Sequence, residues 1–264
     1  MVKLVLLSDL HITDGEALHG RQPVAWLRRA VDHITAHHGD AELCLLLGDL
    51  ANSGSPAQYR ALRNELRSLP LPHRLLLGNH DHRGNFLQAF GAACADALGA
   101  VQDEVDVGGF RCVLLDSHLP DTAGGSLDGG RLERLAAVLA AADRPCLLFL
   151  HHPPLKTGLP AFDAIGLKER DAFAAVIAEQ RRKVAAVFFG HCHMAISGTV
   201  AGVPAFGIRS TVYQALPNLA DARFLDAPGL PPAYAVVLAD EDGISLHHVE
   251  FGYDGLVVAS AAEQ

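Results

Sequence analysis

The sequence predicts a layered α/β fold, and two regular features support that prediction. Up to about residue 193, short apolar runs alternate with segments of helical character, a pattern typical of strand–helix–strand units around a buried sheet. From residue 197 onward, glycine, proline and β-branched residues dominate, which favours antiparallel strands over further strand–helix repeats. We therefore expect a core of strands and helices followed by a part rich in β structure.

The expected elements follow one another in a regular order. Strands are predicted at residues 2–7, 43–47, 74–77, 111–115, 146–150 and 184–189, with helices at 23–38, 56–69, 130–142 and 168–181. The strands are short apolar runs, whereas the helical segments are longer and include alanine-rich stretches that favour helix. Further strands are predicted at 198–200, 205–208, 234–238 and 244–251, and residues 218–232 form the expected long loop, either a lid or an oligomer contact.

No clear linker divides the chain, so residues 1–264 are expected to form a single domain. Its strand–helix core would extend to about residue 193, and its β-rich part would occupy residues 194–264. A layered architecture can accommodate this length around one core.

The composition restricts the class of protein and its partners. Half of the residues are hydrophobic and 19% are charged, which fits a globular enzyme and excludes a disordered or fibrous chain. The formal net charge of -9 leaves no basic surplus for an extended nucleic acid. A small anionic substrate remains open, because bound metal ions can reverse the local charge. No apolar run approaches the roughly 20 residues that span a bilayer, so no membrane association is expected.

The cysteines and the N-terminus indicate the compartment. The five cysteines are widely spaced and form no Cys-x-x-Cys pair, and most lie in apolar runs, as buried free thiols do. The first residues contain neither the apolar region nor the cleavage site of a signal peptide. We therefore expect a reduced, cytoplasmic protein.

Metal-binding residue types follow the predicted strands at five places. The motifs are Asp9-x-His11, Gly48-Asp49, Gly78-Asn79-His80-Asp81, His151-His152-Pro153-Pro154 and Gly190-His191-Cys192-His193. Strand ends are where α/β sheets build their sites. On extended backbone, the spacing of the Asp-x-His and His-x-His pairs would direct both side chains to the same side. The preceding glycines allow a sharp exit from the strand and a close approach of the backbone to an ion.

Each motif alone has an ordinary structural interpretation. Asp-x-His is often found on a surface, Gly-Asp and Gly-Asn-His-Asp in turns, and His-His-Pro-Pro at the end of a helix. Cys192 could join its two histidines in a soft-metal site, but no second cysteine lies near it in the sequence to complete a structural zinc site. The five motifs together, all at strand ends, favour a metal site.

In this order the motifs resemble those of the calcineurin-like metallophosphoesterase superfamily. More specific motifs are similar to those of bacterial class III cyclic-nucleotide phosphodiesterases and glycerophosphodiesterases, namely Asn79-His80-Asp81-x-Arg83, Leu115-Asp116-Ser117, His151-His152-Pro153-Pro154 and Phe162-Asp163-x-x-Gly166-Leu167. The resemblance implies a four-layer αββα sandwich of two mixed sheets, with the metal site at the strand ends along one edge.

The resemblance also assigns roles to individual residues. One metal ion would be held by Asp9, His11, Asp49 and His193, and the other by Asp49, Asn79, His151 and His191, so that Asp49 bridges. His80 matches the catalytic histidine beside the substrate phosphate, and Asp81 is expected to orient it. Substrate contacts are expected from Asn79, His80, Arg83 and His193. His152 would be a neighbour of the ligand His151, because the family pattern is His-x-Pro.

The expected chemistry agrees with this set of residues. Two divalent ions about 3.5 to 4 Å apart activate a bridging hydroxide for in-line attack and hold the phosphate oxygens. Carboxylates and imidazoles accept manganese, iron or zinc with little discrimination. Histidine can transfer a proton near neutral pH, which suits His80.

Three positions leave specific questions open. Position 82, often acidic in this subfamily, is His82, which leaves the substrate preference undecided. Cys192 occupies a position that is often Thr, where it either packs inertly or makes the activity sensitive to oxidation. His118 follows Asp116-Ser117 and either approaches the substrate pocket or has only a surface or capping role.

The expected function is hydrolysis of a small phosphodiester. A 3′,5′-cyclic nucleotide is the first substrate, and a glycerophosphodiesterase or a broad-specificity phosphomono- and diesterase is the alternative. Nucleoside contacts are expected from residues 13–21, 52–56, 154–166 and 209–226. The relatives implied by the resemblance often dimerise near the site, so a homodimer is expected.

Rival functions predict features that the sequence lacks. A protein phosphatase of this superfamily usually has Arg before Gly-Asn-His and Glu after it, where this chain has Leu77 and Asp81. A nuclease would need a basic surface or an accessory domain. A non-enzymatic metal-binding scaffold would have gaps in its ligand set, and this set is complete.

Overall fold

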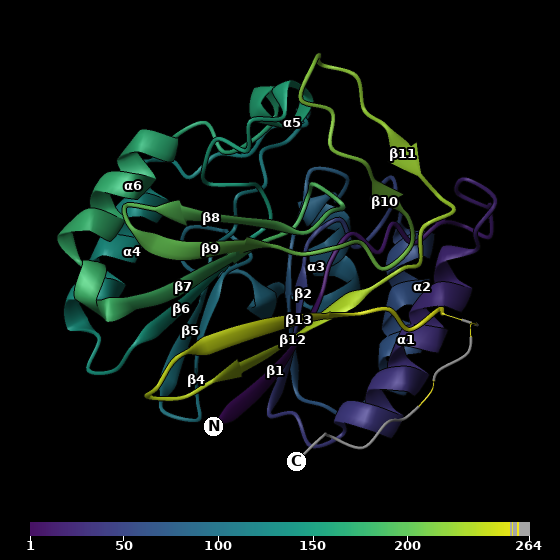
Figure 1. The fold of residues 1–264 in the computed structure, drawn as a ribbon, viewed down its shortest axis with the longest axis horizontal. Helices are drawn as coiled ribbons and strands as arrows, with labels where there is room; N and C mark the ends of the chain where they lie inside the picture. Colours follow the sequence, from purple (N-terminus) through teal and green to yellow (C-terminus); the bar gives the residue numbers. More distant parts are fainter. Residues whose placement is uncertain (254, 256–257, 259–264) are drawn as a thin grey trace.

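Two β-sheets pack face to face in the computed structural model, and helices cover the outer face of each sheet (Figure 1). The structure describes residues 1–253, 255 and 258. One sheet has the strand order β13-β12-β1-β2-β3, and the other has the order β4-β5-β6-β7-β9-β8. The expected four-layer αββα sandwich of two mixed sheets is confirmed.

The first sheet is built around three parallel strands from the N-terminal part of the chain. Its strands are β1 (Val2–Leu7), β2 (Leu43–Leu47), β3 (His73–Leu76), β12 (Tyr234–Ala239) and β13 (Ile244–Val249). β1, β2 and β3 are parallel neighbours, whereas β12 and β13 extend the sheet with antiparallel pairing. The helices α1 (Pro23–His38), α2 (Pro56–Leu66) and α3 (Arg83–Phe90) follow the three parallel strands in turn.

The second sheet is formed mainly by the middle of the chain. Its strands are β4 (Asp103–Val107), β5 (Phe110–Leu114), β6 (Cys146–Leu150), β7 (Val184–Phe189), β8 (Ile196–Val200) and β9 (Val203–Gly207). β5, β6, β7 and β9 are parallel, and β4 and β8 are antiparallel edge strands. Its helices are α4 (Gly129–Ala141), α5 (Pro160–Ala164) and α6 (Arg170–Glu179).

Four short elements complete the described chain. Two 3-10 helices lie at Ala92–Cys94 and Arg181–Lys183. The strands β10 (Gln214–Ala215) and β11 (Asp226–Ala227) pair antiparallel and close a long loop of residues 216–225. This two-stranded ribbon projects from the upper right of the molecule in Figure 1. The predicted loop at residues 218–232 therefore contains a short strand, β11, that pairs with β10.

The apolar strands supply side chains to two layers at once. In β1, Leu6 belongs to the core between the two sheets, whereas Leu7 belongs to the core beneath the helices of the first sheet. In β6, Phe149 faces the first sheet and Leu150 faces the helices of the second sheet. Successive side chains of a strand point to opposite faces, so an uninterrupted apolar strand is buried on both sides.

The predicted elements are largely confirmed, with differences at the edges. The strands at residues 2–7, 43–47, 146–150 and 184–189 and the helix at 23–38 have the predicted bounds. The sequence did not predict α3, α5 or β4. β4 is an edge strand in which valine alternates with aspartate and glutamate, so it lacks a continuous apolar run. The antiparallel tail is confirmed for β8, β12 and β13, but β9 also pairs in parallel with β7.

The structure also shows the state of the cysteines and the character of the helices. All five cysteines are free thiols, and four of them are buried. In the described part of the chain, each helix is too short or too polar to cross a bilayer.

Candidate metal centre

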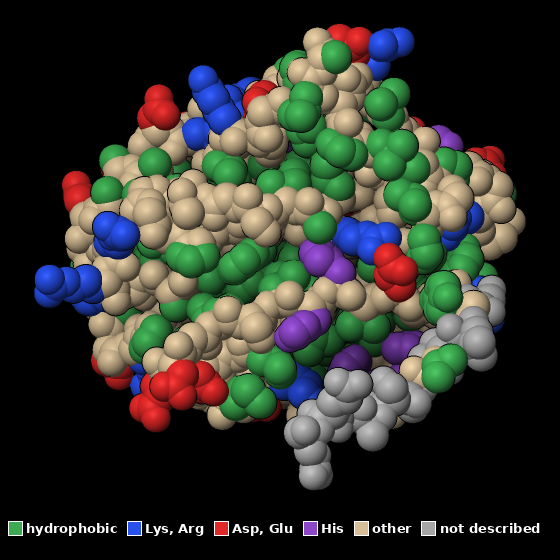
Figure 2. Space-filling view, in the orientation of Figure 1, with side chains coloured by type: hydrophobic (Ala, Val, Ile, Leu, Met, Phe, Trp, Pro, Cys, Tyr) green, Lys and Arg blue, Asp and Glu red, His purple; other side chains and the backbone are tan. Residues whose placement is uncertain are grey.

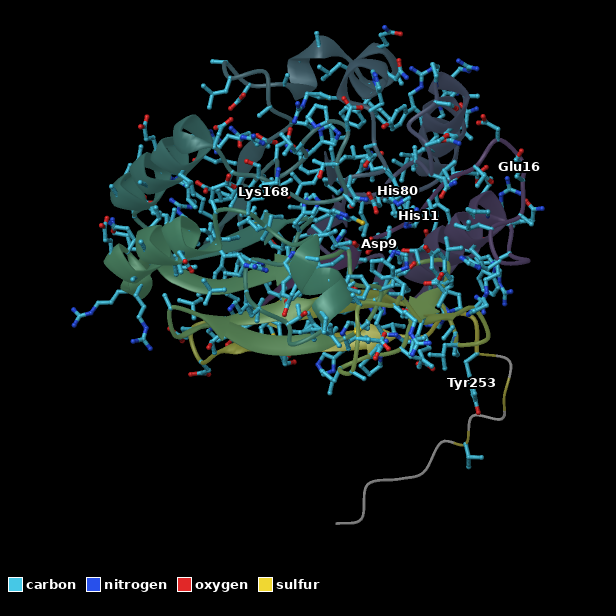
Figure 3. All side chains as sticks on the ribbon, turned by 90° about the horizontal axis from the view of Figure 1, so that it is seen from above. Asp9, His11, Glu16, His80, Lys168 and Tyr253 are labelled. Carbon is cyan, nitrogen blue, oxygen red and sulfur yellow. The ribbon has the colours of Figure 1, made fainter. Side chains whose placement is uncertain are left out.

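The seven predicted ligand residues converge at one edge of the sandwich. Asp9 and His11 follow β1, Asp49 follows β2, and Asn79 follows β3, which are neighbours in the first sheet. His151 follows β6 and His191 and His193 follow β7, which are neighbours in the second sheet. Within each sheet these strands run parallel to one another, so their carboxyl ends lie at one edge of that sheet. Asp9, His11 and His80 lie close together there in Figure 3.

The backbone at these residues is not the extended backbone that the sequence predicts. Asp9, His11, Asp49, His191 and His193 have φ angles of 53°, 44°, 48°, 69° and 52°. Their strands end at Leu7, Leu47 and Phe189, so these residues lie in left-handed turns beyond the sheet. Residues other than glycine seldom adopt this conformation, because it costs about 1–3 kcal/mol per residue. Residues strained in this way occur most often at functional sites. The expected geometry of the i, i+2 pairs is wrong, although the side chains do meet.

Glycines make the close packing of these turns possible. Gly48 has a φ of 93°, which favours glycine at the exit from β2. A Cβ atom at Gly78 would lie 2.6 Å from Nε2 of His151 and still closer to the Asp49 carboxylate. A larger residue at position 78 would therefore displace two candidate ligands.

One group of ligand atoms gathers around His193. Its Nδ1 donates a hydrogen bond to the carbonyl oxygen of Tyr213 (3.1 Å), which directs Nε2 toward the cavity. Nε2 of His193 lies 3.1 Å from Nε2 of His11 and 3.4 Å from Oδ1 of Asp9. Three electron-rich atoms therefore face one another, an arrangement that a shared cation stabilises.

A second group gathers around His151. Its Nδ1 donates to the carbonyl oxygen of Leu47 (2.7 Å), so that Nε2 faces the other ligands. This Nε2 lies 3.4 Å from Oδ2 of Asp49 and 3.3 Å from Oδ1 of Asn79. The same Oδ2 of Asp49 lies 3.7 Å from Nε2 of His11. The Asp49 carboxylate thus lies between the two groups, as expected of a bridge.

The charges of these buried groups are strongly coupled. Burial lowers the pKa of His151, but the charge of Asp49 and its hydrogen bond more than offset this and raise that pKa to about 9. Burial would raise the pKa of Asp9, yet the charge of His193 lowers it to about 2. Without metal, the two carboxylates therefore hold protons on nearby imidazoles. A divalent cation supplies the same positive charge and displaces those protons.

Two other candidate ligands, His11 and His191, have a lowered pKa and stay neutral. Burial lowers the pKa of both His11 and His191 to about 3. Nε2 of His191 is buried and has no hydrogen-bond partner among the described residues. A buried neutral imidazole nitrogen without a partner suits a metal ligand, so the residues present fit the implied ions.

His152 lies closer to the centre than the sequence motif suggests. Its ligand atom falls within 4.8 Å of those of His151 and His191, and its Nε2 has no partner among the described residues. Its Nδ1 lies 2.8 Å from Oγ of Ser117, which fixes the ring. It is therefore a direct neighbour of two candidate ligands.

The expected contact between Asp81 and the ring of His80 is wrong. The carboxylate of Asp81 accepts hydrogen bonds from the amides of Leu50, Ala51 and Gly78 and from the Tyr59 hydroxyl, at 2.9 to 3.1 Å. Burial, followed by the charge of Asp49, raises the pKa of Asp81 to about 6. Nδ1 of His80 instead donates to the carbonyl oxygen of Asn52 (2.8 Å). Asp81 thus joins the loops after β2 and β3, and Asn52 orients His80.

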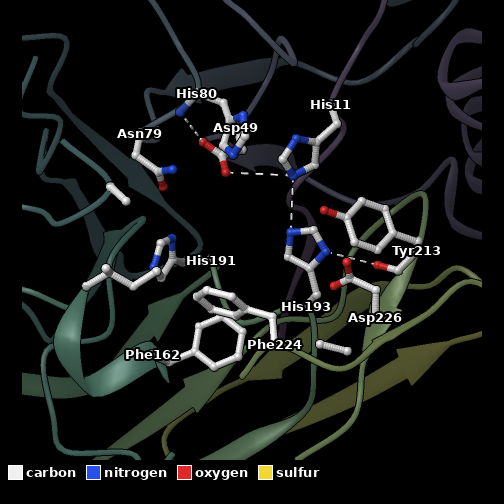
Figure 4. A pocket seen from close by; sticks show the side chains of 13 residues that line it. His11, Asp49, Asn79, His80, Phe162, His191, His193, Tyr213, Phe224 and Asp226 are labelled. Atoms are coloured by element: carbon white, nitrogen blue, oxygen red, sulfur yellow. Dashed lines mark hydrogen bonds and ion pairs between the residues drawn. The ribbon is translucent and has the colours of Figure 1, made fainter. Parts of the chain in front are cut away.

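Two cavities meet at Asn79 and His80. The first has a volume of about 270 Å³ and is lined by candidate ligands together with Ala123, Phe162, Ile165, Tyr213, Ala215, Phe224 and Asp226 (Figure 4). The second has a volume of about 650 Å³ and shares Asn79, His80 and Ala123 with the first. It is lined by Ser53, Asp81, His82, Arg83, Gly84, His118 and the segment 120–123. A phosphate held near His80 would therefore adjoin both cavities.

Arg83 and His118 belong to the second cavity and are absent from the lining of the first. Arg83 donates through Nη2 to the fully buried carboxylate of Asp116 (2.9 Å) and also contacts the carbonyl oxygen of His118. Nε2 of His118 donates to the carbonyl oxygen of Asp81 (2.9 Å). His82 lies at the N-terminus of α3, where its Nδ1 accepts from the amide of Asn85. The expected substrate contact of Arg83 would thus be made in the second cavity.

The sequence did not single out three residues of the first cavity. Tyr213, Phe224 and Asp226 line it, and all three lie in the segment 209–226 from which nucleoside contacts are expected. The pairing of β10 with β11 brings these three residues to the site. Such a contact leaves no local motif in the sequence that could identify them. Cys192, by contrast, is fully buried in the core beneath the helices of the second sheet, as an inert thiol would be.

Comparison with known proteins connects this site to a family. The family model described as calcineurin-like phosphoesterase matches residues 2–195, which include every predicted ligand. A probable cyclic nucleotide phosphodiesterase of Rhodopseudomonas palustris is 37% identical over 259 residues, covering 96% of this chain and 94% of the relative. The 3′,5′-cyclic adenosine monophosphate phosphodiesterase CpdA of Pseudomonas aeruginosa is 30% identical over 245 residues, covering 92% of this chain and 87% of the relative.

A solved structure shares the fold. Purple acid phosphatase from yellow lupin seeds matches with a TM-score of 0.69 at 14% identity, covering 97% of this chain and 52% of that chain. This chain therefore spans about half the length of the phosphatase, and at this identity the likeness shows the fold alone. The family match over residues 2–195 and the two similar relatives are decisive: the chain belongs to the calcineurin-like phosphoesterase family.

Proposed function

We propose that this protein is a metal-dependent phosphodiesterase that hydrolyses 3′,5′-cyclic nucleotides. The observation that carries the proposal is the convergence of two buried carboxylates and several imidazole nitrogens beside an open cavity that His80 lines. The names of the two relatives, a probable cyclic nucleotide phosphodiesterase and a cyclic adenosine monophosphate phosphodiesterase, support the substrate class.

In this proposal two metal ions occupy the two groups of ligand atoms. One ion is held by Asp9, His11, Asp49 and His193, and the other by Asp49, Asn79, His151 and His191. Their carboxylate and imidazole atoms fit manganese, iron or zinc. When bound, the ions supply an activated water and neutralise the charge of the phosphate. The carbonyl oxygens of Leu47 and Tyr213 hold His151 and His193 in the required tautomer.

His80 is the residue proposed to move a proton. Its backbone amide donates to Oδ1 of Asp49 (2.9 Å), which ties its position to the metal ligands. Because Nδ1 is held by the carbonyl oxygen of Asn52, Nε2 remains available to the substrate in the cavity. In the protonated ring, the Nε2–H group can donate to the leaving oxygen of the diester.

The substrate class is tested by comparing a diester with its matched monoester. With manganese added, we expect faster hydrolysis of bis(4-nitrophenyl) phosphate than of 4-nitrophenyl phosphate. A diester has two ester groups, one for each of the two cavities that meet at His80. The series is then repeated with iron and zinc, and with cyclic AMP, cyclic GMP and 2′,3′-cyclic nucleotides. A reversed ratio would contradict a diesterase, and no turnover at full metal loading would contradict an enzyme.

The second cavity favours a second candidate function. A cyclic nucleotide joins both ester oxygens to one ribose, so it needs space on one side of the phosphate only. The second cavity, lined by polar groups of His82, Arg83, His118 and Thr122, suits the second alcohol of an open-chain diester such as a glycerophosphodiester. Adding a glycerophosphodiester to the substrate series decides whether the chain prefers open or cyclic diesters.

The organisation of the protein is also proposed. The C-terminal strands complete both sheets, which supports a single domain over residues 1–264. Five free thiols support a cytoplasmic location. The loop between β10 and β11 has three exposed leucines, Leu216, Leu219 and Leu225, and Figure 2 shows apolar side chains on the surface in this region. Exposed apolar side chains that gather in one region support a homodimer. Sedimentation of a monomer at micromolar concentration would contradict the dimer.

A further inference from the structure

One wall of the first cavity is aromatic. Phe162 from α5 and Phe224 from the loop before β11 have ring centroids 5.1 Å apart, with their planes at 77°. The ring of Phe162 lies 5.9 Å from the ring of His191. Figure 4 shows the two phenylalanines side by side next to His191 and His193. The aromatic wall therefore extends directly from the candidate metal ligands.

The ring of Phe224 remains open to the cavity. Phe162 is only 7% exposed, whereas Phe224 is 51% exposed, although both are large apolar side chains. Leaving apolar surface in water costs free energy that burial would recover. Since Phe224 also lines the cavity, its open surface is in position to be covered by a ligand.

Hydrogen bonds of the loop hold Phe224 in that position. The amide of Leu216 donates to the carbonyl oxygen of Leu225 (2.8 Å), next to Phe224 in the chain. Nδ2 of Asn218 donates to the Asp221 carboxylate (2.7 Å) and to the carbonyl oxygen of Arg223 (3.1 Å). These hydrogen bonds fix the loop on both sides of Phe224 without using its ring, so the ring surface is prearranged for binding.

Polar groups line another part of the same cavity. Asp226 and Tyr213 line this cavity. In Figure 4, His193 lies between these two residues and the two phenylalanines. The ring of Tyr213 lies 4.5 Å from that of His193, and the Asp226 carboxylate lies 3.5 Å from His19. A flat ring with polar edges matches both walls, whereas an acyl chain would leave the polar wall without hydrogen bonds.

We propose that Phe224, together with Phe162, binds the nucleobase of the substrate by stacking, so that Phe224 determines the preference for nucleotides over diesters without a ring. This assignment rests on the proposed function and identifies the part of the substrate that the cavity recognises. Aromatic stacking accepts every base, because each base has a π-face. The chain should therefore accept both adenine and guanine nucleotides.

The test compares Phe224→Ala with Phe224→Tyr on two substrates. For cyclic AMP, the alanine variant should raise KM about tenfold, the size expected for loss of one base-stacking contact. The tyrosine variant keeps the ring and should stay near the wild-type KM. For glycerophosphoethanolamine, which has no ring, both variants should behave like the wild type. Equal effects of the alanine variant on both substrates, or none on either, would overturn the proposal.

Binding of the product separates this inference from the proposed function. Calorimetric titration with adenosine 5′-monophosphate should show about tenfold weaker binding to Phe224→Ala. The matched control is Leu219→Ala, which removes an exposed apolar side chain of the same loop (71% exposed) outside the lining of the cavity. If the wild type hydrolyses no cyclic nucleotide but the alanine variant alone loses affinity, the proposed function fails and the stacking assignment stands. If all three proteins bind the product equally, the stacking assignment fails.

Discussion

Replacing Asp49 by alanine is expected to abolish phosphodiester hydrolysis. The loss should exceed the roughly 10²–10³-fold reduction in kcat that follows removal of one stabilising donor, since this carboxylate serves three partners. Its Oδ2 lies 3.4 Å from Nε2 of His151 and 3.7 Å from Nε2 of His11. Its Oδ1 accepts the amide of His80 at 2.9 Å. The substitution therefore weakens both proposed metal sites and releases the residue proposed to move a proton.

Metal content measures the first of these effects directly. After dialysis against the chosen metal, inductively coupled plasma mass spectrometry should find fewer ions per chain in Asp49→Ala than in the wild type. Asp40→Ala is the matched control, because Asp40 is an exposed carboxylate that precedes β2, whereas Asp49 follows the same strand. The exposed ion pair of Asp40 with Lys3 contributes little stability. Circular dichroism checks that both variants are folded. An Asp49 variant that retains both ions and full turnover would contradict the assigned bridge.

The strands that carry the candidate ligands are predictable from local sequence. β2, β6 and β7 are uninterrupted apolar runs, and β1 is interrupted only by Lys3. Such runs predict strands that are buried on both faces. The division into two sheets is not predictable in the same way. It depends on β12 pairing with β1 and on β9 pairing with β7, contacts between distant segments that no local periodicity records.

The candidate ligands are predictable by residue type, but their geometry is not. Asp and His directly after apolar strands are costly to bury without partners, which marks them in the sequence. In the Asp9-x-His11 and His191-x-His193 pairs, the left-handed backbone contradicts the extended geometry inferred from the spacing. Likewise, Asp81 matches a family motif, yet it turns back to the amides of three other residues. Side-chain direction at a loop depends on tertiary contacts that motif spacing does not describe.

His80→Ala should reduce kcat for cyclic AMP by about 10²–10⁴-fold, the range for loss of a general acid or base, with metal content unchanged. Its amide, which contacts Asp49, is retained in the variant, whereas the ring that binds the Asn52 carbonyl oxygen is lost. The ligand atom of His80 nevertheless lies within 4.8 Å of those of His11 and Asp49. Loss of an ion from the variant would therefore identify His80 as a metal ligand instead.

The leaving group distinguishes proton transfer by His80 from a purely positioning role. A ribose alkoxide needs a proton to leave, whereas 4-nitrophenolate is stable without one, so only the former should depend on the Nε2–H group. His80→Ala should consequently lose far more activity on cyclic AMP than on bis(4-nitrophenyl) phosphate. His37→Ala, which removes an exposed histidine of α1, serves as the matched control. Equal losses on both substrates would mean that His80 acts on the phosphate oxygens, which both diesters share, and not on the leaving group.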